Sequence, residues 1–364
     1  MAKSKIDELN KILVGYVNTI NDTLQLFEQI PPPTQYKLSW NNVLQMSDYL
    51  SKQATIVGML WTGGEPPKAE ALKEAMESYF NALQGFLLHC HGSMTDAGPT
   101  LSSSIHASVK QIVDSSFRLL KGSVSLHEES YEKGKKSSIP QLTGAVWEAC
   151  FNLKKVPATN IKAIGRAMTQ VTVSMKDVLR EMEELKPACS SPEHDDVSEN
   201  PECGTPNSDE DDDDEDDLGD DLSLEELEVA KMVADVVSET LMVIKELIRV
   251  VTVMIKLENP KDNGEFVDLL EKLLKLCQET GVQIDELGAC VYPPQELSLM
   301  KETMERIRGN IGEIEDDVKS FKNSSSEALL GTCRKLQSSI EYMETELDKR
   351  VEAEVVCKLQ NVTV

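Results

Sequence analysis

The chain has 364 residues, of which 40% are hydrophobic and 5% are aromatic, and its formal net charge is −26. A chain of this length supports two domain cores, because a single hydrophobic core stops growing at about 250–300 residues. The negative charge disfavours direct binding to nucleic acid or to anionic lipid, since both attract proteins through Lys and Arg.

Residues 1–186 are predicted to form an N-terminal helical bundle in an all-α fold, because good helix formers dominate and aromatic residues are scarce. Between Ile6 and Phe27, apolar residues recur every three or four positions and therefore lie on one helical face. Three prolines at 31–33 end this helix, because proline lacks an amide hydrogen. Further helices are predicted over 38–60, 67–91, 101–126 and 142–154.

Two later segments have apolar residues spaced every 3.5 residues on average, which predicts helices packed lengthwise in up-and-down bundles. The first stripe consists of Ile161, Ile164, Met168, Val171, Met175, Val178 and Met182. The second consists of Leu329, Cys333, Leu336, Ile340, Met343 and Leu347. A dimeric coiled coil is the alternative interpretation of the same spacing.

Residues 187–221 are predicted to be a disordered acidic linker, because they lack any apolar period and are rich in Pro, Ser, Asp and Glu. Within them, residues 209–221 hold eleven acidic side chains among thirteen. This acidic tract could bind basic partners such as histones, or it could serve only as a solubilising spacer. Both interpretations stay open.

Three positions in the linker are candidate phosphorylation sites. Ser208 precedes Asp-Glu-Asp, which is a signature of acidophilic kinases of the casein-kinase type. Ser191 and Thr205 each precede a proline, which is a minimal proline-directed site. Phosphates here would add negative charge and could change the choice of partner.

Residues 222–364 are predicted to form a C-terminal helical bundle. Ser223 and Glu226 form a capping box, followed by a helix to about residue 257 that is apolar on several sides and therefore central. Helices are predicted over 265–280 and 283–290, and then over 295–321. A second capping box, Ser324 with Glu327, starts the last helix.

The sequence predicts neither an enzyme nor a cofactor or metal site. It contains no glycine-rich phosphate loop of the GxGxxG or GxxxxGK[ST] type. Neighbouring residues on a helix point about 100° apart, so the run His89-Cys90-His91 is not expected to bind a metal. The eight cysteines are scattered and are interpreted as reduced thiols of a soluble protein. The longest apolar run, residues 241–255, contains three charged residues and is not expected to span a membrane.

Two short segments resemble the cyclin-D-binding protein family, whose members are also described as helix-loop-helix proteins lacking a basic region. The segments comprise Ala145, Val146, Trp147, Glu148, Ala149 and Cys150, with Pro157 and Asn160 downstream, and then Val291, Tyr292, Pro293 and Pro294. The resemblance implies two bundles of the talin and vinculin type. It also implies binding to D-type cyclins or helix-loop-helix transcription factors, negative regulation of cell-cycle progression, and a location in nucleus and cytoplasm.

These family residues have structural interpretations as well. Val146 and Trp147 are expected in the core, and residues 292–294 are expected to break a helix. Cyclins dock Arg-x-Leu segments, but the leucines of Arg118-Leu119-Leu120 and Arg334-Lys335-Leu336 are expected to face the core. The favoured function is a protein-binding regulator that sequesters its partners. The alternatives are a cytoskeletal or adhesion-type scaffold and a histone binder.

Overall fold

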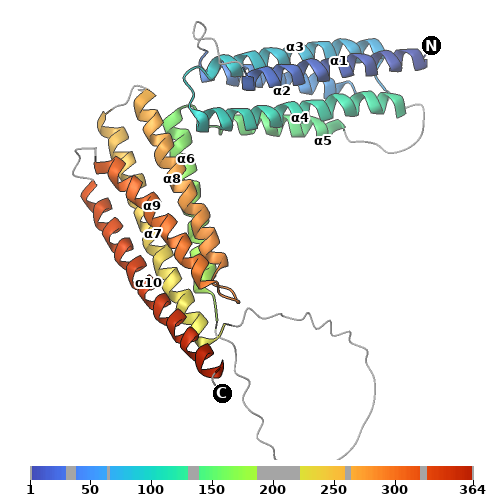
Figure 1. The fold of residues 1–364 in the computed structure, drawn as a ribbon. Coiled ribbons are helices and arrows are strands. Elements are labelled where there is room, and N and C mark those ends of the chain that lie inside the picture. Colours follow the sequence, from blue (N-terminus) through green and yellow to red (C-terminus); the bar gives the residue numbers. More distant parts are fainter. Residues whose placement is uncertain are drawn as a thin grey trace, which may run out of the picture. The chain divides into compact units, whose positions relative to one another are not determined.

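A computed structural model describes residues 2–29, 38–63, 66–129, 139–186, 222–258, 264–319 and 326–362. In these ranges the regular structure consists of ten α-helices without a strand, which confirms the all-α prediction (Figure 1). The chain divides into two compact units. Unit 1 comprises Met1–Ala167 and Lys261–Glu271, and unit 2 comprises Met168–Pro260 and Lys272–Val364.

Unit 1 contains a ring of five helices. They are α1 (Ala2–Gln29), α2 (Trp40–Met59), α3 (Ala69–Ser93), α4 (Pro99–Glu129) and α5 (Ile139–Leu153). Helix α2 packs between α3 and α5, α4 packs between α5 and α1, and α1 closes the ring against α3. The five predicted helices of this region are confirmed, with ends that differ by a few residues.

The core of unit 1 contains aromatic side chains without solvent exposure, among them Tyr79 and Phe86. The Tyr79 hydroxyl donates a hydrogen bond of 2.8 Å to Ser116 Oγ, and Ser116 Oγ donates to the Ile112 carbonyl at 2.6 Å. Burial raises the pKa of Tyr79 well above its usual range. The hydroxyls of Tyr79 and Ser116 therefore both have partners, which avoids the cost of leaving these two polar groups unsatisfied.

Unit 2 is a bundle of parallel and antiparallel helices (Figure 1). They are most of α6 (Asn160–Glu183), α7 (Leu224–Glu258), most of α8 (Gly264–Ala289), α9 (Leu297–Lys319) and α10 (Ser326–Val362). The prediction of two helices over 265–280 and 283–290 is wrong, because both segments belong to α8. Gly281 lies between them, and a glycine inside a helix costs only about 1 kcal/mol relative to alanine.

Helix α7 begins at the predicted capping box. Ser223 Oγ accepts a hydrogen bond from the Glu226 amide at 3.2 Å, and the Glu226 carboxylate accepts one from the Ser223 amide at 2.9 Å. Residues along α7 from Val229 to Met254 are buried on several sides, as expected for a central helix. Ser324 of the second predicted box lies outside the described residues.

The second stripe with heptad spacing, and the part of the first stripe from Met168 onwards, belong to unit 2. Each of the six predicted residues from Leu329 to Leu347 on α10 is at most 1% exposed. On α6, Met168, Met175 and Met182 are also buried. These stripes pack within one chain in the structure, as the bundle interpretation predicts.

The division into units differs from the predicted domain boundary at residue 186. Residues of α6 from Met168 onwards belong to unit 2, because α6 packs closely on α8. A Cβ atom placed on Gly281 would lie 3.1 Å from Val171 Cγ1, and one on Gly288 would lie 2.7 Å from Val178 Cγ1. The predicted linker, residues 187–221, lies outside the described residues.

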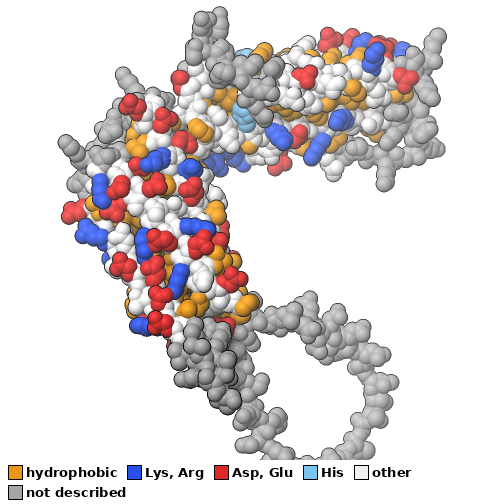
Figure 2. Space-filling model, viewed as in Figure 1, with side chains coloured by type: hydrophobic (Ala, Val, Ile, Leu, Met, Phe, Trp, Pro, Cys, Tyr) orange, Lys and Arg blue, Asp and Glu red, His pale blue; other side chains and the backbone are white. Residues whose placement is uncertain are grey.

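Charged side chains of both signs are interspersed over the face of unit 2 seen in Figure 2. Several form ion pairs between helices, such as Arg308 with Glu344 at 2.6 Å and Arg350 with Glu228 at 2.8 Å. Exposed pairs of this kind contribute only about 0–1 kcal/mol each. Among the described helices, none has the length and hydropathy needed to span a membrane.

Substituting Gly288→Ala should destabilise unit 2 by about 1–3 kcal/mol, because the new methyl group would overlap Val178. All three tryptophans of the chain lie in unit 1, so tryptophan fluorescence follows the unfolding of unit 1 alone. In urea, the unfolding midpoint measured by far-UV circular dichroism should move to lower urea concentration, while the midpoint measured by tryptophan fluorescence should stay unchanged. Gly309→Ala on α9 is the control, since no atom lies within 4 Å of the added Cβ. Equal effects of both variants would contradict the close packing of α6 on α8.

Candidate protein-interaction surfaces

Unit 1 exposes large apolar side chains on both α2 and α5. Tyr49, Ile56 and Met59 on α2 are 46%, 47% and 65% exposed, and Trp147 and Phe151 on α5 are 46% and 58% exposed. We call these five residues the α2–α5 patch. Grouped exposed apolar side chains of this size are typical of surfaces that bind another molecule.

Side-chain contacts join the two helices beneath the patch and show that they run antiparallel. Trp147 Nε1 donates a hydrogen bond of 3.1 Å to Thr55 Oγ1. Lys154, seven residues after Trp147 on α5, forms an ion pair of 2.9 Å with Asp48, which is seven residues before Thr55 on α2. The indole of Trp147 is thus held against α2, and the patch extends across both helices.

Close packing between α2 and α5 explains why the large side chains stay outside. A Cβ atom placed on Gly58 would lie 2.7 Å from Thr143 Oγ1, so the helices leave no room for a large side chain between them. Thr143 itself is buried. Further along α5, Trp147 and Phe151 keep about half of their side-chain surface exposed to solvent.

The family segment on α5 therefore has two faces. Val146, Ala149 and Cys150 are buried, which agrees with the structural interpretation. The expectation that Trp147 belongs to the core is wrong, since nearly half of the side chain is exposed. Of this segment, only Trp147 contributes to the α2–α5 patch.

Positive charges border the α2–α5 patch, although the whole chain is strongly acidic. The ammonium group of Lys155 lies 5.0 Å from the centre of the Phe151 ring, within cation–π range. Lys52 is exposed on α2, whereas the charge of Lys154 is balanced by its ion pair with the exposed Asp48. The charges of Lys52 and Lys155 suit a partner surface that carries acidic residues at its edge.

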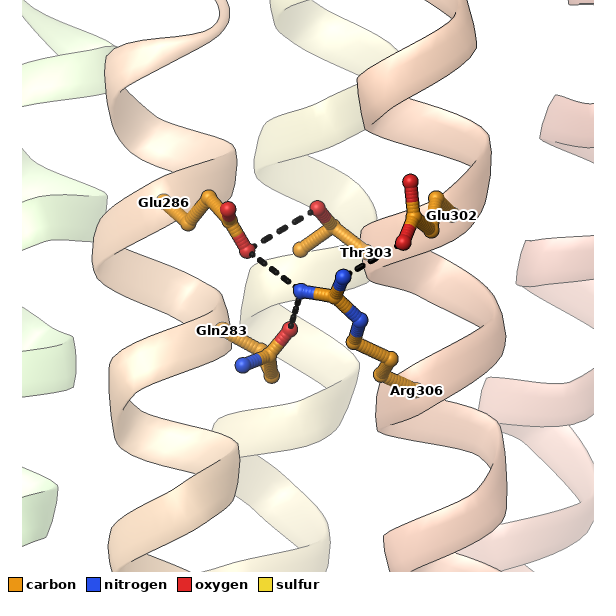
Figure 3. Close-up of polar contacts among 5 residues, drawn as sticks. All are labelled: Gln283, Glu286, Glu302, Thr303 and Arg306. Carbon is orange, nitrogen blue, oxygen red and sulfur yellow. Dashed lines mark hydrogen bonds and ion pairs between the residues drawn. The ribbon is translucent and has the colours of Figure 1, made fainter.

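Unit 2 contains a different kind of surface, a cluster of polar side chains between α8 and α9 (Figure 3). Glu286 accepts hydrogen bonds of 3.3 Å from both Thr303 Oγ1 and Arg306 Nη1. The guanidinium group of Arg306 also contacts Gln283 at 3.5 Å and forms an ion pair with Glu302. Thr303 is fully buried, so its bond to Glu286 satisfies a hydroxyl within the bundle.

The same pairing of α8 with α9 continues along both helices. Asn310 Nδ2 donates to Thr280 Oγ1 at 3.4 Å, and Lys272 pairs with Asp317 at 2.8 Å. These groups are engaged with one another across the interface. The cluster therefore fixes the register of the two helices and does not present a reactive group.

The described cysteine side chains are poor nucleophiles. Cys90, Cys150, Cys277, Cys290 and Cys333 are buried and form no disulfide. Burial raises the pKa of each thiol, to about 12 for Cys277 and Cys333. Because the thiolate is the reactive form, these residues act as core side chains.

Asn160 connects two turns of unit 1. Its Oδ1 accepts a hydrogen bond from the Gly98 amide at 2.7 Å, and its Nδ2 donates to the Asp96 carbonyl at 2.9 Å. Asp96 has a φ of 67°, a backbone conformation that is unfavourable for residues other than glycine. The hydrogen bonds of Asn160 stabilise this turn. Pro157 lies in the short connection that leads into α6. Both family residues therefore have structural positions.

The remaining predicted residues lie in connections. Tyr292, Pro293 and Pro294 fall between the end of α8 and the start of α9, and the bond between the two prolines is cis. The candidate phosphorylation sites Ser191, Thr205 and Ser208 lie outside the described residues.

The two Arg-x-Leu segments do not expose their leucines. Leu119, Leu120 and Leu336 are at most 2% exposed, in the middle of α4 and α10. A cyclin could reach them only if these helices unfolded locally. A docking surface for a partner must therefore be sought elsewhere.

Comparison with known proteins identifies the family. The model described as Grap2 and cyclin-D-interacting, N-terminal, matches residues 42–188, and its C-terminal counterpart matches residues 209–316. The chain belongs to the Grap2 and cyclin-D-interacting family. It is also 22% identical over 255 residues to a Xenopus laevis protein named Cyclin-D1-binding protein 1 homolog, covering 70% of this chain and 72% of the relative. The resemblance to the cyclin-D-binding protein family is thereby confirmed.

The N-terminal Grap2 and cyclin-D-interacting match contains all five residues of the α2–α5 patch. None of them was predicted as an interaction residue from the sequence, and Trp147 was expected in the core. A signal does exist in α5, where Trp147 and Phe151 are spaced four residues apart, away from the buried positions Val146 and Cys150. Apolar residues on more than one face of a surface helix indicate a second contact.

The run His89-Cys90-His91 lies at the end of α3, and its side chains have different surroundings. Cys90 is buried, and the His91 ring stacks on Phe27 with 4.8 Å between ring centres. Burial and the nearby His106 lower the pKa of His91. Among the described residues, no three potential ligands come together around a metal position.

The lowered pKa of His91 predicts a pH dependence of stability. In the unfolded chain the pKa of His91 is about 6.5, so above that pH the side chain is neutral in both the folded and the unfolded protein. Below that pH the unfolded protein binds a proton at His91 more readily than the folded protein does, which favours unfolding. The free energy of unfolding of unit 1, followed by tryptophan fluorescence, should therefore fall as the pH drops from 7.5 towards about 5.5. His91→Phe should make this slope shallower. An unchanged slope would show that other groups cause the dependence.

Proposed function

We propose that the protein is a non-catalytic regulator that sequesters D-type cyclins or helix-loop-helix transcription factors and so restrains cell-cycle progression in nucleus and cytoplasm. The observation that carries this proposal is the similarity, over 70% of the chain, to a relative whose name states that it binds cyclin D1. The family is named for an interaction and not for a reaction, which supports a binding role.

The α2–α5 patch is the face on which we place the cyclin. It offers five large apolar side chains, including a tryptophan held in position by Thr55. Burying apolar surface contributes about 25 cal/mol per Å², and interface energy concentrates in aromatic anchors such as Trp147. An amphipathic helix of the partner, with its apolar side on the patch, fits this surface.

The charges around the patch add specificity. Lys52 and Lys155 lie on the same two helices as the apolar residues, while Asp48 balances the charge of Lys154, so a helix with acidic residues at its edges would be preferred over a basic one. A partner bound in this way loses access to its own complexes, because the same helix face cannot contact two proteins. Sequestration then follows from competition without any chemical step.

Helix-loop-helix factors form the second class of partner in this proposal. Their dimers are helical bundles, so a helix face of one subunit becomes available when it is not paired. The α2–α5 patch presents two helices side by side and could replace the missing subunit. Competition between a D-type cyclin and such a factor for the protein would support a shared surface.

The double variant Trp147→Ser, Phe151→Ser should lose at least about 2 kcal/mol of binding free energy for a purified D-type cyclin, roughly a thirtyfold loss of affinity. The measurement is a titration with full-length protein, and circular dichroism checks that each variant folds. Leu88→Ser on α3 is the matched control, because Leu88 is 63% exposed and lies outside the patch.

The result separates the site from the function. Cyclin binding that is unaffected by the double variant would move the interface away from the α2–α5 patch. Failure of the wild-type protein to bind both D-type cyclins and helix-loop-helix factors would overturn the proposed function itself. Recovery of filament proteins or histones from cell extract, without cyclins, would favour a scaffold or a histone-binding protein.

A further inference from the structure

Helices α7 and α10 of unit 2 lie side by side and form a groove on their outer surface (Figure 1). They run antiparallel, because Glu228 in the first part of α7 pairs with Arg350 in the later part of α10, whereas residues 235–239 share a pocket with residues 334–339. The pocket has a volume of about 600 Å³, and three of its seven lining residues are serines. We call the exposed surface of residues 235–242 and 334–342 the α7–α10 groove.

Two pairs of opposite charge line this groove. Asp235 and Glu239 are one turn apart on α7, and Arg334 and Lys335 are neighbours on α10. Ion pairs join α8 to α9 and α9 to α10 elsewhere in unit 2. None of the four groove side chains forms an ion pair with another residue in the part of the chain that the structure describes. Their charges are therefore available to another molecule.

The two charged pairs are offset along the groove, which explains why they do not pair within one chain. Arg334 precedes Arg350 by 16 residues, so it lies opposite residue 244 of α7, which follows Glu228 by 16 residues. Glu239 lies five residues before residue 244, an offset of about 7 Å at 1.5 Å per residue. The acidic pair therefore lies at one end of the groove and the basic pair at the other.

Two exposed apolar side chains lie on the same surface. Met242 is 39% exposed and follows Glu239 by three residues, so both share a face of α7. Tyr342 is 62% exposed and follows Lys335 by seven residues on α10. In the antiparallel arrangement, Met242 lies across from the basic pair and Tyr342 lies across from the acidic pair. The charges thus occupy one diagonal of the groove and the apolar side chains occupy the other.

We propose that the α7–α10 groove is the interface of a homodimer and that its occupant is a second copy of this chain. A two-fold axis in the plane of this surface, midway between the charged pairs and perpendicular to the line that joins them, exchanges their positions. Each acidic pair then faces the basic pair of the other copy, while Met242 and Tyr342 lie near the axis and close to their own counterparts. A surface that is complementary to itself forms a closed dimer.

The presence of both charges favours a second copy over other occupants. Asp235 and Glu239 repel an anion, and Arg334 and Lys335 repel a cation, so the groove does not select a ligand of one sign. The net charge of −26 makes two copies repel each other, but at about 0.15 M salt this repulsion is screened beyond about 8 Å. Close opposite charges are screened less. The dimer is independent of the α2–α5 patch and of the proposed binding to cyclins.

The first test is sedimentation equilibrium of the full-length protein over a series of concentrations at about 0.15 M salt. The apparent mass should rise from the monomer mass of 40.4 kDa towards twice that value. Asp235→Lys with Glu239→Lys should weaken dimerisation at least about tenfold, because like charges then face each other. This double variant also makes the net charge less negative, so general repulsion alone would give the opposite result.

Asp285→Lys with Glu313→Lys is the matched control for this charge change. Both residues are exposed, on α8 and α9, and lie outside the groove. The control changes the net charge by the same amount and should not weaken dimerisation. Circular dichroism checks that each variant folds.

The second test exchanges the charges between two copies. Arg334→Glu with Lys335→Glu should also weaken self-association at least about tenfold. An equal mixture of this variant with the Asp235→Lys, Glu239→Lys variant should dimerise again, because every acidic pair then faces a basic pair. A dimer formed through any other surface does not show this recovery.

The third test removes the apolar contact at the axis. Tyr342→Ser should weaken dimerisation about tenfold, because a buried aromatic ring contributes strongly to an interface. Val282→Ser is its control, since Val282 is also 62% exposed and lies on α8, outside the groove. This control should leave the dissociation constant unchanged.

Three results would overturn the proposal: a wild-type protein that stays monomeric at every concentration, dimerisation that neither charge variant weakens, and a mixture of the two variants that does not dimerise. If a variant does not fold, carbodiimide coupling of mixed ¹⁴N- and ¹⁵N-labelled wild-type copies still decides. Glu239 of one copy should then be joined to Lys335 of the other, and cross-links found only within one copy would reject the interface.

Discussion

Burial of an apolar stripe against the centre of a five-helix ring or bundle holds each unit together. On α10 the stripe from Leu329 to Leu347 is almost completely removed from solvent, and on α6 Met168 to Met182 follow the same spacing. Burial of this kind is non-directional, so it favours bundles without selecting one register between neighbouring helices. More specific contacts must select the register, and these contacts are few.

Small residues and paired polar groups supply those contacts. Because Gly288 has no Cβ, Val178 of α6 can pack against α8. In the same way, Gly58 lets Thr143 of α5 pack against α2. Between α8 and α9, Thr303 and Arg306 share the carboxylate of Glu286, so a slip of one turn would leave a buried hydroxyl without its partner. Steric fit and hydrogen-bond satisfaction thus define which helix faces meet.

The surfaces available to partners are consequences of the same packing. While Val146, Ala149 and Cys150 of α5 are buried, Trp147 and Phe151 stay partly exposed, where they can contact another protein. The thiols, in contrast, are buried with raised pKa values and are unreactive. The described thiols thus act as core side chains, whereas Trp147 and Phe151 are accessible to a partner.

The sequence by itself determined the helical class, nearly all helix positions, the capping box at Ser223 and the family, because these depend on periodicity and on short local motifs. It did not determine that α6 packs with unit 2, that α8 runs without a break through Gly281, or that Trp147 is exposed. Periodicity shows which face of a helix is apolar, but not which neighbour covers that face. Helix α5 is apolar on more than one side, and only its packing against α2 and α4 decided which side became core and which became the candidate binding surface.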